Sequence, residues 1–234
     1  MNSDLYNAAA GGDIETLKRI SNSELLESQE TPQKNTVLHV AVQVASARNE
    51  KGPYFEKEKI EEICKICPAL IRRVNSKGDT PLHIAARGGR SDIVKLLVDE
   101  DAIPRSLVTM VNSKKDTALH EALRNHHLFD RKYQNEYLEV VKTLLQKEPE
   151  LSNFINDAGE SPAFMATREG LCDFLVVILN LDCCKEYGGP GKSTALHAAV
   201  LLREDGEKTG IYDYIQSAKT AGGTRNIGMS LLLI

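Results

Sequence analysis

The sequence has no tryptophan, and aromatic residues of all kinds make up only 5% of its 234 residues. Aromatic side chains supply much of the core in many globular domains, so their scarcity favours a stack of helices with small contact residues over a sandwich or barrel. Long hydrophobic runs are also missing. The longest, residues 174–179, and the run at 231–234 are far shorter than the roughly 20 apolar residues that cross a bilayer. We therefore predict no membrane span.

Signals for secretion and for nucleic-acid binding are absent as well. The segment Met1–Asp4 has neither the basic nor the apolar region of a signal peptide, and no Asn-x-Ser/Thr glycosylation acceptor occurs. The 29 basic and 33 acidic side chains give a net charge of −4, without the basic excess of nucleic-acid-binding domains. We expect a protein of the reducing cytoplasm that binds no nucleic acid.

What the sequence does contain is one short motif copied along its length. Aligned on Leu38, Leu82, Leu119, Ala163 and Leu196, the copies are 44, 37, 44 and 33 residues apart. A degenerate unit around residues 5–17 precedes them. Self-similarity at such a period indicates a solenoid of stacked repeats. The five copies are Thr36–Ala41, Thr80–Ala85, Thr117–Ala122, Ser161–Ala166 and Thr194–Ala199.

Each copy is typical of a helix start followed by a second helix. Thr80 can cap a helix with its hydroxyl, Pro81 is tolerated in the first turn, and Gly88-Gly89 ends the helix. A second helix follows, with apolar residues at helical spacing, as in Ile93–Leu97. Each unit leaves an apolar face that only its neighbours can cover.

A period near 33 residues with the pattern Thr-Pro-Leu-His resembles ankyrin repeats. The resemblance implies an all-α ankyrin-repeat solenoid of about six helix-turn-helix repeats, the first and last degenerate. We expect an array over residues 1–216 and an irregular tail over 217–234 that leaves a frayed end at Ile211–Ile215. The approximate repeats are 1–30, 31–74, 75–111, 112–155, 156–188 and 189–216.

Three weaker marks resemble the cytosolic array of plant ankyrin membrane proteins of the accelerated-cell-death type: Cys67–Leu70, Arg124–His127 and Glu148–Leu151. The resemblance implies a non-catalytic protein-interaction scaffold in plant defence or stress signalling. The alternative is a truncated relative that acts only by associating with a full-length, membrane-bound ankyrin protein. That partner would hold it at the cytosolic face of the plasma membrane.

Two insertions lengthen the turn between the helices of a repeat, residues 46–56 and 128–137. They are polar, charged and partly aromatic. They either extend a helix or form a loop along one rim of the solenoid. Because loops lengthen at small entropic cost, tolerated surface insertions are the simpler interpretation.

Several short motifs resemble catalytic or ligand-binding motifs, but none of them indicates an enzyme. The run Gly188–Ser193 resembles the end of a phosphate-binding loop, but its first glycine would fall at residue 186, a glutamate. Cys64 and Cys67 form a CxxC on the apolar face of a helix and close to its C-terminal end, where the dipole raises a thiol pKa. We therefore predict no nucleotide, cofactor or metal. By resemblance, His39, His83, His120 and His197 make structural hydrogen bonds.

What remains is binding of a protein partner, and not of a small-molecule substrate. By resemblance, ankyrin arrays contact partners with the turn tips and with exposed positions of the first helix. In the second repeat these are Gln33 and Asn35 at the tip and Gln43 and Val44 on the helix. Carried onto the later repeats, the rule gives Lys77, Asp79, Arg87, Lys114, Asp116, Arg124, Asn125, Glu160, Arg168 and Glu169.

Within this set the cations Lys77, Arg87, Lys114, Arg124 and Arg168 form a basic stripe with interspersed acids. Such a stripe suits an acidic peptide or protein surface, although an ordinary solvated face has the same composition. One turn departs from the pattern because a lysine, at position 115, replaces the expected glycine. We expect that tip to be distorted.

Overall fold

The computed structural model describes residues 1–20, 23–47, 57–99, 105–125, 134–181, 183–184, 187–195 and 197–198. Over these residues the chain forms twelve α-helices, and its β pairing is limited to one isolated bridge between Gly188 and Thr194. The all-α repeat solenoid predicted from the sequence is confirmed. The predicted tail, the frayed end at 211–215 and most of the two insertions lie outside the described residues.

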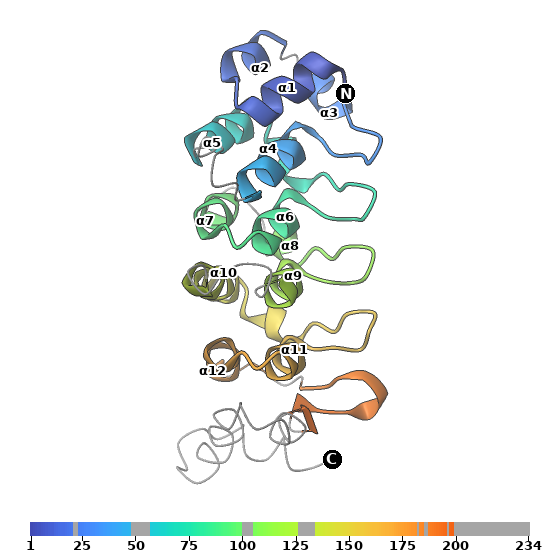
Figure 1. Ribbon diagram of the computed structural model, residues 1–234, viewed down its shortest axis with the longest axis vertical. Coiled ribbons are helices and arrows are strands. Elements are labelled where there is room, and N and C mark those ends of the chain that lie inside the picture. The colour runs from blue at the N-terminus through green and yellow to red at the C-terminus, as the bar shows by residue number, and fades with distance from the viewer. Residues whose placement is uncertain are drawn as a thin grey trace.

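The helices stack in two parallel columns, with hairpin-like loops projecting to one side (Figure 1). One column contains α1 (Ser3–Gly11), α4 (Val37–Ser46), α6 (Pro81–Arg87), α9 (Ala118–Asn125) and α11 (Pro162–Arg168). We call these the inner helices because they lie next to the hairpins. The outer helices are α2 (Ile14–Ile20), α5 (Lys57–Ile66), α7 (Ser91–Asp99), α10 (Gln134–Lys147) and α12 (Cys172–Leu179).

Shorter helices connect the repeats. Two of them are α3 (Ser23–Ser28) and α8 (Arg105–Val108). Three 3₁₀ helices, η1 (Pro68–Arg72), η4 (Pro149–Asn153) and η5 (Pro190–Lys192), complete the described elements. None of the helices in the described ranges is long and apolar enough to cross a membrane.

The repeated quartet opens the inner helices, as the sequence predicts. In α6, Thr80 is extended and its hydroxyl accepts a hydrogen bond from the N–H of His83, while Pro81 lies in the first turn. Gly88 caps the other end, and Gly89 takes the left-handed conformation with φ of 63° that leads into α7. Alanines such as Ala85 are fully buried, which lets inner helices of adjacent repeats pack closely.

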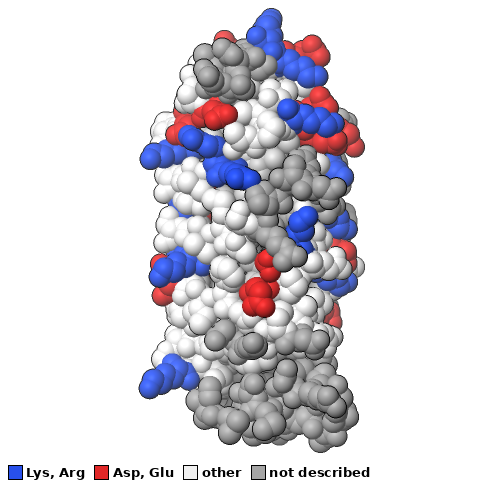
Figure 2. Space-filling model, turned by 180° about the vertical axis from the view of Figure 1, so that it is seen from behind, with Lys and Arg blue, Asp and Glu red and all other residues white. Residues whose placement is uncertain are grey.

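The outer helices supply the larger apolar side chains of a continuous core. Ile93, Val94 and Leu97 of α7 are fully buried. Cys64 lies on α5 and Cys67 just after it, and both are buried, as are Ile60 and Ile63 of the same helix. The predicted core stripe is therefore confirmed. The back of the molecule, in contrast, mixes positive and negative side chains among uncharged ones (Figure 2).

Part of the second insertion extends a helix. Helix α10 begins at Gln134, and Tyr137 within it is fully buried. Its hydroxyl donates to the carbonyl oxygen of Arg87 at 2.8 Å. Its ring packs so closely on Gly89 that a Cβ on this glycine would lie 2.5 Å from the ring carbon Cε2. At this position the insertion contributes to the core and is not merely tolerated on the surface.

Candidate functional site

The hairpins that connect successive repeats share one hydrogen-bonded geometry. In the second of them, Asn75 Oδ1 accepts from the backbone N–H groups of Lys77 at 2.9 Å and Asp79 at 3.1 Å. Asn112 and Asn156 do the same in the next two hairpins. An asparagine that binds its own backbone in this way is a standard means of fixing a turn.

Adjacent hairpin tips are joined to each other through the backbone. Ser76 N–H donates to Gln33 O, and Ser113 N–H donates to Lys77 O, each at 2.9 Å. Asp157 N–H donates to Lys114 O at the same distance. The tips therefore form a continuous ridge whose members have a fixed register.

Buried carboxylates lie at the base of the ridge. Asp79 and Asp116 are fully buried, and Glu160 is 5% exposed. Each of the two aspartates accepts a hydrogen bond from the asparagine of the following hairpin, from Asn112 at 3.0 Å and from Asn156 at 2.9 Å respectively. These contacts link side chains that are 33 and 40 residues apart in the sequence.

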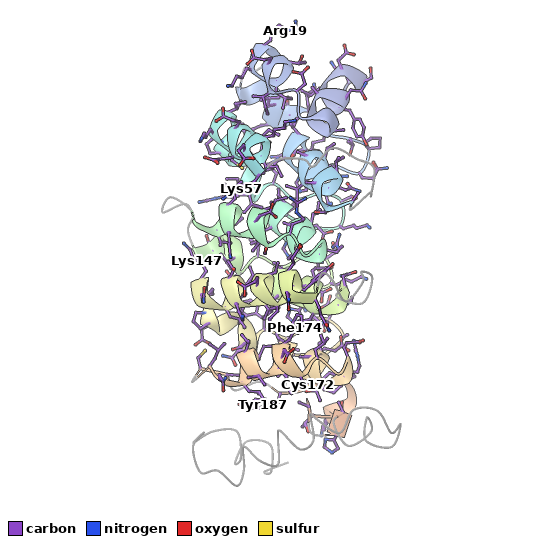
Figure 3. The ribbon with its side chains drawn as sticks, turned by 60° about the vertical axis from the view of Figure 1, so that its left-hand side comes forward. Arg19, Lys57, Lys147, Cys172, Phe174 and Tyr187 are labelled. Carbon is purple, nitrogen blue, oxygen red and sulfur yellow. The ribbon has the colours of Figure 1, made fainter. Side chains whose placement is uncertain are left out.

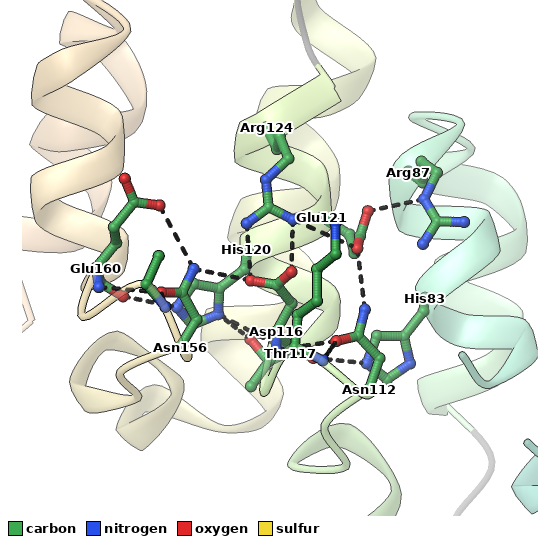
Figure 4. A network of polar contacts seen from close by, with 12 residues as sticks. His83, Arg87, Asn112, Asp116, Thr117, His120, Glu121, Arg124, Asn156 and Glu160 are labelled. Atoms are coloured by element: carbon green, nitrogen blue, oxygen red, sulfur yellow. Dashed lines mark hydrogen bonds and ion pairs between the residues drawn. The ribbon is translucent and has the colours of Figure 1, made fainter. Parts of the chain in front are cut away.

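The arginine eight residues after each acid neutralises it. Arg87 Nη2 donates to Asp79 Oδ2 at 2.7 Å, and Arg124 donates to both oxygens of Asp116 (Figure 4). Arg168 pairs with Glu160 in the same way. The second repeat has a neutral version of the pair, Asn35 and Gln43.

Glu121 of α9 completes a second set of contacts that the sequence analysis missed. It is 4% exposed, and it accepts from Arg87 Nε at 2.7 Å and from Asn112 Nδ2 at 3.1 Å. The signal was present in the alignment, because the equivalent positions are the apolar Val40, Ile84 and Met165. A carboxylate in an otherwise apolar column indicates a buried polar partner.

The ion pairs shift the pKa values of their members. Burial alone would raise the pKa of Asp116, but hydrogen bonds from Arg124 and Asn156 outweigh it, so that the pKa is lowered. The hydrogen bonds from Arg124 to Asp116 raise the arginine pKa. Burial opposes the charge on Arg87, yet Glu121 and Asp79 together raise its pKa. These side chains stay charged and paired.

Three of the quartet histidines, His39, His83 and His120, connect adjacent repeats, as the resemblance implies. His83 Nδ1 accepts from Thr80 N–H at 3.2 Å, and its Nε2 contacts Asp116 O of the next repeat at 3.1 Å. A carbonyl can only accept, so Nε2 carries the proton and the ring is neutral. Burial is the main cause of a lowered pKa in His39, His83 and His120, to about 4 in His120.

The structure divides the sequence-predicted binding residues into three groups. The three acids, Asp79, Asp116 and Glu160, belong to the network of hairpin asparagines, buried acids and paired arginines, which we call the lattice. Lys77 and Lys114 are exposed at the tips. The remaining predicted residues lie at the C-terminal ends of inner helices: Arg87, Arg124 and Arg168 in the ion pairs, Asn125 bonded to Glu121, and Glu169 bonded to Arg168 at 3.0 Å.

The turn at position 115 is not distorted, so this expectation is wrong. Lys115 adopts φ of 55°, close to the 74° of Gly78 and 77° of Gly159. Its turn keeps the same two backbone hydrogen bonds, Asn112 N–H to Asp116 O and Lys115 N–H to Asn112 O, each at 2.9 Å. A non-glycine residue can adopt this conformation at a cost of about 1 kcal/mol, which the surrounding hydrogen bonds offset.

A pocket lies between the ridge and the inner helices at the second and third repeats. It has a volume of about 380 Å³. Its walls come from the first two hairpin tips, including Gln33 and Lys77, and from the ends of α4 and α6, including Gln43 and Ile84. Ser46 also lines it, and its buried hydroxyl has no hydrogen-bond partner among the residues that the structure describes. We call the space between ridge and inner helices the groove.

The chemical motifs have structural roles where the structure describes them. Burial, followed by the nearby Glu27 carboxylate, raises the pKa of Cys67. The direction matches the prediction, although burial and not the helix end is the main cause. The described residues contain no cluster of three or more histidine, cysteine, aspartate or glutamate side chains suited to a metal. The run Gly188–Ser193 forms the tip of another hairpin, with Gly189 N–H bonded to Ser193 O at 2.8 Å.

Comparison with known proteins agrees with this architecture. Residues 56–133 match the family model of ankyrin repeats in three copies. Protein ACCELERATED CELL DEATH 6 of Arabidopsis thaliana is 25% identical over 174 residues, which are 73% of this chain and 24% of that protein. This chain thus spans about a quarter of the length of that curated relative.

Among solved structures, the ankyrin repeat domain of Bcl-3, titled a unique member of the IkappaB protein family, superimposes with a TM-score of 0.69. The match covers 94% of this chain and 86% of that domain at 17% identity, and it establishes the fold. The chain therefore has the fold of an ankyrin-repeat solenoid.

Proposed function

We propose that this ankyrin-repeat solenoid is a cytoplasmic, non-catalytic scaffold that binds its protein partner in the groove and acts in plant defence or stress signalling. The observation that carries the binding site is the arrangement of the groove. Exposed side chains such as Gln43 and Lys77 surround a pocket, above a lattice of buried ion pairs. Similarity to Protein ACCELERATED CELL DEATH 6 supports the role in plant signalling.

The lattice favours binding because it fixes the backbone that presents the groove. Backbone bonds join the tips, and asparagine side chains join each tip to the acid of the preceding repeat. A surface that is already ordered loses little conformational entropy when a partner binds, so more of the contact energy appears as affinity.

The arginines of the predicted basic stripe belong to this lattice. Arg87, Arg124 and Arg168 are partly exposed, but each pairs with an acid of the lattice. Replacing them would disturb the fold as well as the surface. A test of binding therefore needs side chains that are exposed and outside the lattice.

The proposal is tested by affinity capture from plant extract. The groove variant combines Gln33→Arg at the first hairpin tip with Val44→Glu on α4, two exposed positions outside the lattice whose charge changes cancel. The control combines Gln146→Arg with Gln134→Glu, two exposed positions on α10 of the outer column. Circular dichroism first establishes that all three proteins are equally helical.

A partner that the wild type and control capture and that the groove variant loses is the expected result. Equal capture by all three proteins would mean that binding does not use the groove. If every protein captures only a longer membrane-bound ankyrin protein, association with that relative replaces the proposed adaptor role.

A further inference from the structure

We propose that the groove recognises an extended acidic peptide segment, whose carboxylates contact the lysines of the first three hairpin tips. A neutral polar side chain of the same segment enters the pocket beneath them. The inference rests on the proposed function, because it specifies the partner of the same groove. In this proposal the partner contacts the lysines of the tips and not the arginines of the inner helices.

The tip lysines are the cations available to a partner. Lys34, Lys77 and Lys114 are exposed, and none forms an ion pair with any residue that the structure describes. The acids of the same turns, Asp79 and Asp116, are buried against arginines. Positive side chains project along the tip edge in the view from behind (Figure 2). The ridge therefore presents ammonium groups without adjacent free carboxylates.

The charge pattern changes at the fourth tip, which limits the length of the site. There Asp157 and Ala158 replace the serine and lysine of the second and third tips. Asp157 pairs with Lys115 of the third tip at 2.8 Å. An acidic segment is therefore attracted to the first three tips and finds no lysine of the fourth tip to contact.

The pocket beneath the first two tips favours a neutral group. Here the lattice pair is Asn35 and Gln43 in place of an acid and an arginine, and both amides line the pocket. Ser46, beside Gly88, also lines the pocket, and its buried hydroxyl has no hydrogen-bond partner within the described part of the chain. A ligand group that bonds this hydroxyl would recover an interaction that the free protein lacks.

The spacing of the tips predicts the spacing of the acids. Packed helices lie about 8–10 Å apart, and an extended chain advances about 3.3 Å per residue. Acidic residues that reach successive tips are therefore about three positions apart. The pocket side chain lies between the first two of them.

The test starts with selection of binders to the wild-type protein from a displayed library of random peptides of about twelve residues. We expect enriched peptides with acidic residues at three-residue spacing. The affinity of an enriched peptide is then measured by fluorescence anisotropy at low and high salt. The tip variant combines Lys34→Gln, Lys77→Gln and Lys114→Gln.

A matched control removes the same charge elsewhere. It combines Arg19→Gln, Lys57→Gln and Lys147→Gln on α2, α5 and α10, away from the hairpin tips (Figure 3). We expect the tip variant to bind the peptide about tenfold more weakly at low salt, with a smaller salt dependence, and the control to bind like the wild type.

A second variant, Ser46→Ala, tests the pocket separately. It removes an unpartnered hydroxyl, so we expect equal or higher thermal stability together with about fivefold weaker peptide binding. Unchanged binding in this variant would overturn the pocket contact. Selection of peptides without acids, no selection at all, or equal losses in the tip and control variants would overturn acidic recognition.

Vesicles containing phosphatidylserine give a final comparison. If wild type binds them, the tip variant does not, and no acidic peptide is selected, the tips recognise a membrane surface and the proposal is wrong. Failure here is distinct from failure of the proposed function. A protein captured through the groove but retained by the tip variant would leave the scaffold intact and refute only acidic recognition.

Discussion

Asp116 and Arg124 form a double hydrogen bond, with Nη1 to Oδ2 at 2.5 Å and Nη2 to Oδ1 at 2.8 Å, in which the carboxylate is fully buried. They are eight residues apart. Asp116 lies where the hairpin joins the inner helix α9, and Arg124 lies at the end of that helix. The same spacing separates Asn35 from Gln43, where both side chains are neutral. The pair is thus either charged on both sides or on neither.

The first prediction uses this rule. Arg124→Gln should lower the free energy of unfolding by about 3 kcal/mol, because it leaves a buried carboxylate without its cation. Adding Asp116→Asn should recover most of the loss, since the neutral pair already occurs in the second repeat. Urea unfolding of both single variants and the double variant measures the coupling. A double variant no more stable than Arg124→Gln would refute the pairing rule.

The second prediction concerns pH. The pKa values of His39, His83 and His120 are lowered in the folded state, to about 4 for His120, while the unfolded value is about 6.5. Between these values the unfolded chain binds more protons, so the histidine contribution is complete above pH 6.5 and is lost as the pH falls toward 4.

His120 should contribute up to about 1.4 kcal/mol per pH unit in that window, and His39 and His83 change the stability in the same direction. Urea unfolding between pH 7 and pH 5 measures the slope. The variant His120→Asn cannot titrate there, so its stability should depend less steeply on pH than that of the wild type. Identical slopes would mean that His120 does not stay neutral in the fold.

The third prediction compares two glycines with the same backbone conformation. Gly78 and Gly159 have φ of 74° and 77°, but a Cβ on Gly78 would lie 2.8 Å from the backbone nitrogen of Ser113, whereas on Gly159 its nearest neighbour would be 3.9 Å away. Gly159→Ala should cost about 1 kcal/mol for the left-handed conformation. Gly78→Ala should cost clearly more, because the bond between the second and third tips must shift. Equal losses in thermal unfolding would contradict the close approach of these tips.

The fourth prediction concerns the insertion residue Tyr137. Tyr137→Phe should cost about 1 kcal/mol through loss of the hydrogen bond to Arg87 O, and Tyr137→Ala about 3–5 kcal/mol through the cavity beside Gly89. Tyr6→Phe, at a side chain that is 45% exposed, is the control and should change stability little. An insertion that was only tolerated would give a small loss for Tyr137→Ala as well.

The solenoid and its helices could be predicted from the sequence because the signals are local and repeated. Thr80 and Pro81 start a helix, Gly88 and Gly89 end it, and the apolar residues of the second helix follow within one turn or two. Caps, turn residues and helical periodicity act over a few residues. Five copies of the pattern then require stacking, since a single repeat cannot cover its own apolar face.

Which charged side chains of the groove a partner can contact was decided by the tertiary structure. The basic stripe inferred from sequence combined Lys77 and Lys114, which stay exposed, with arginines that the fold pairs to buried acids. The partner of Arg87 in the next repeat, Glu121, is 34 residues away in the chain, and that contact exists only once two repeats stack in register. The sequence by itself determined which residues carry charge and how the helices repeat. Stacking determined which charges are neutralised, because burial removes the water that would otherwise solvate each ion separately.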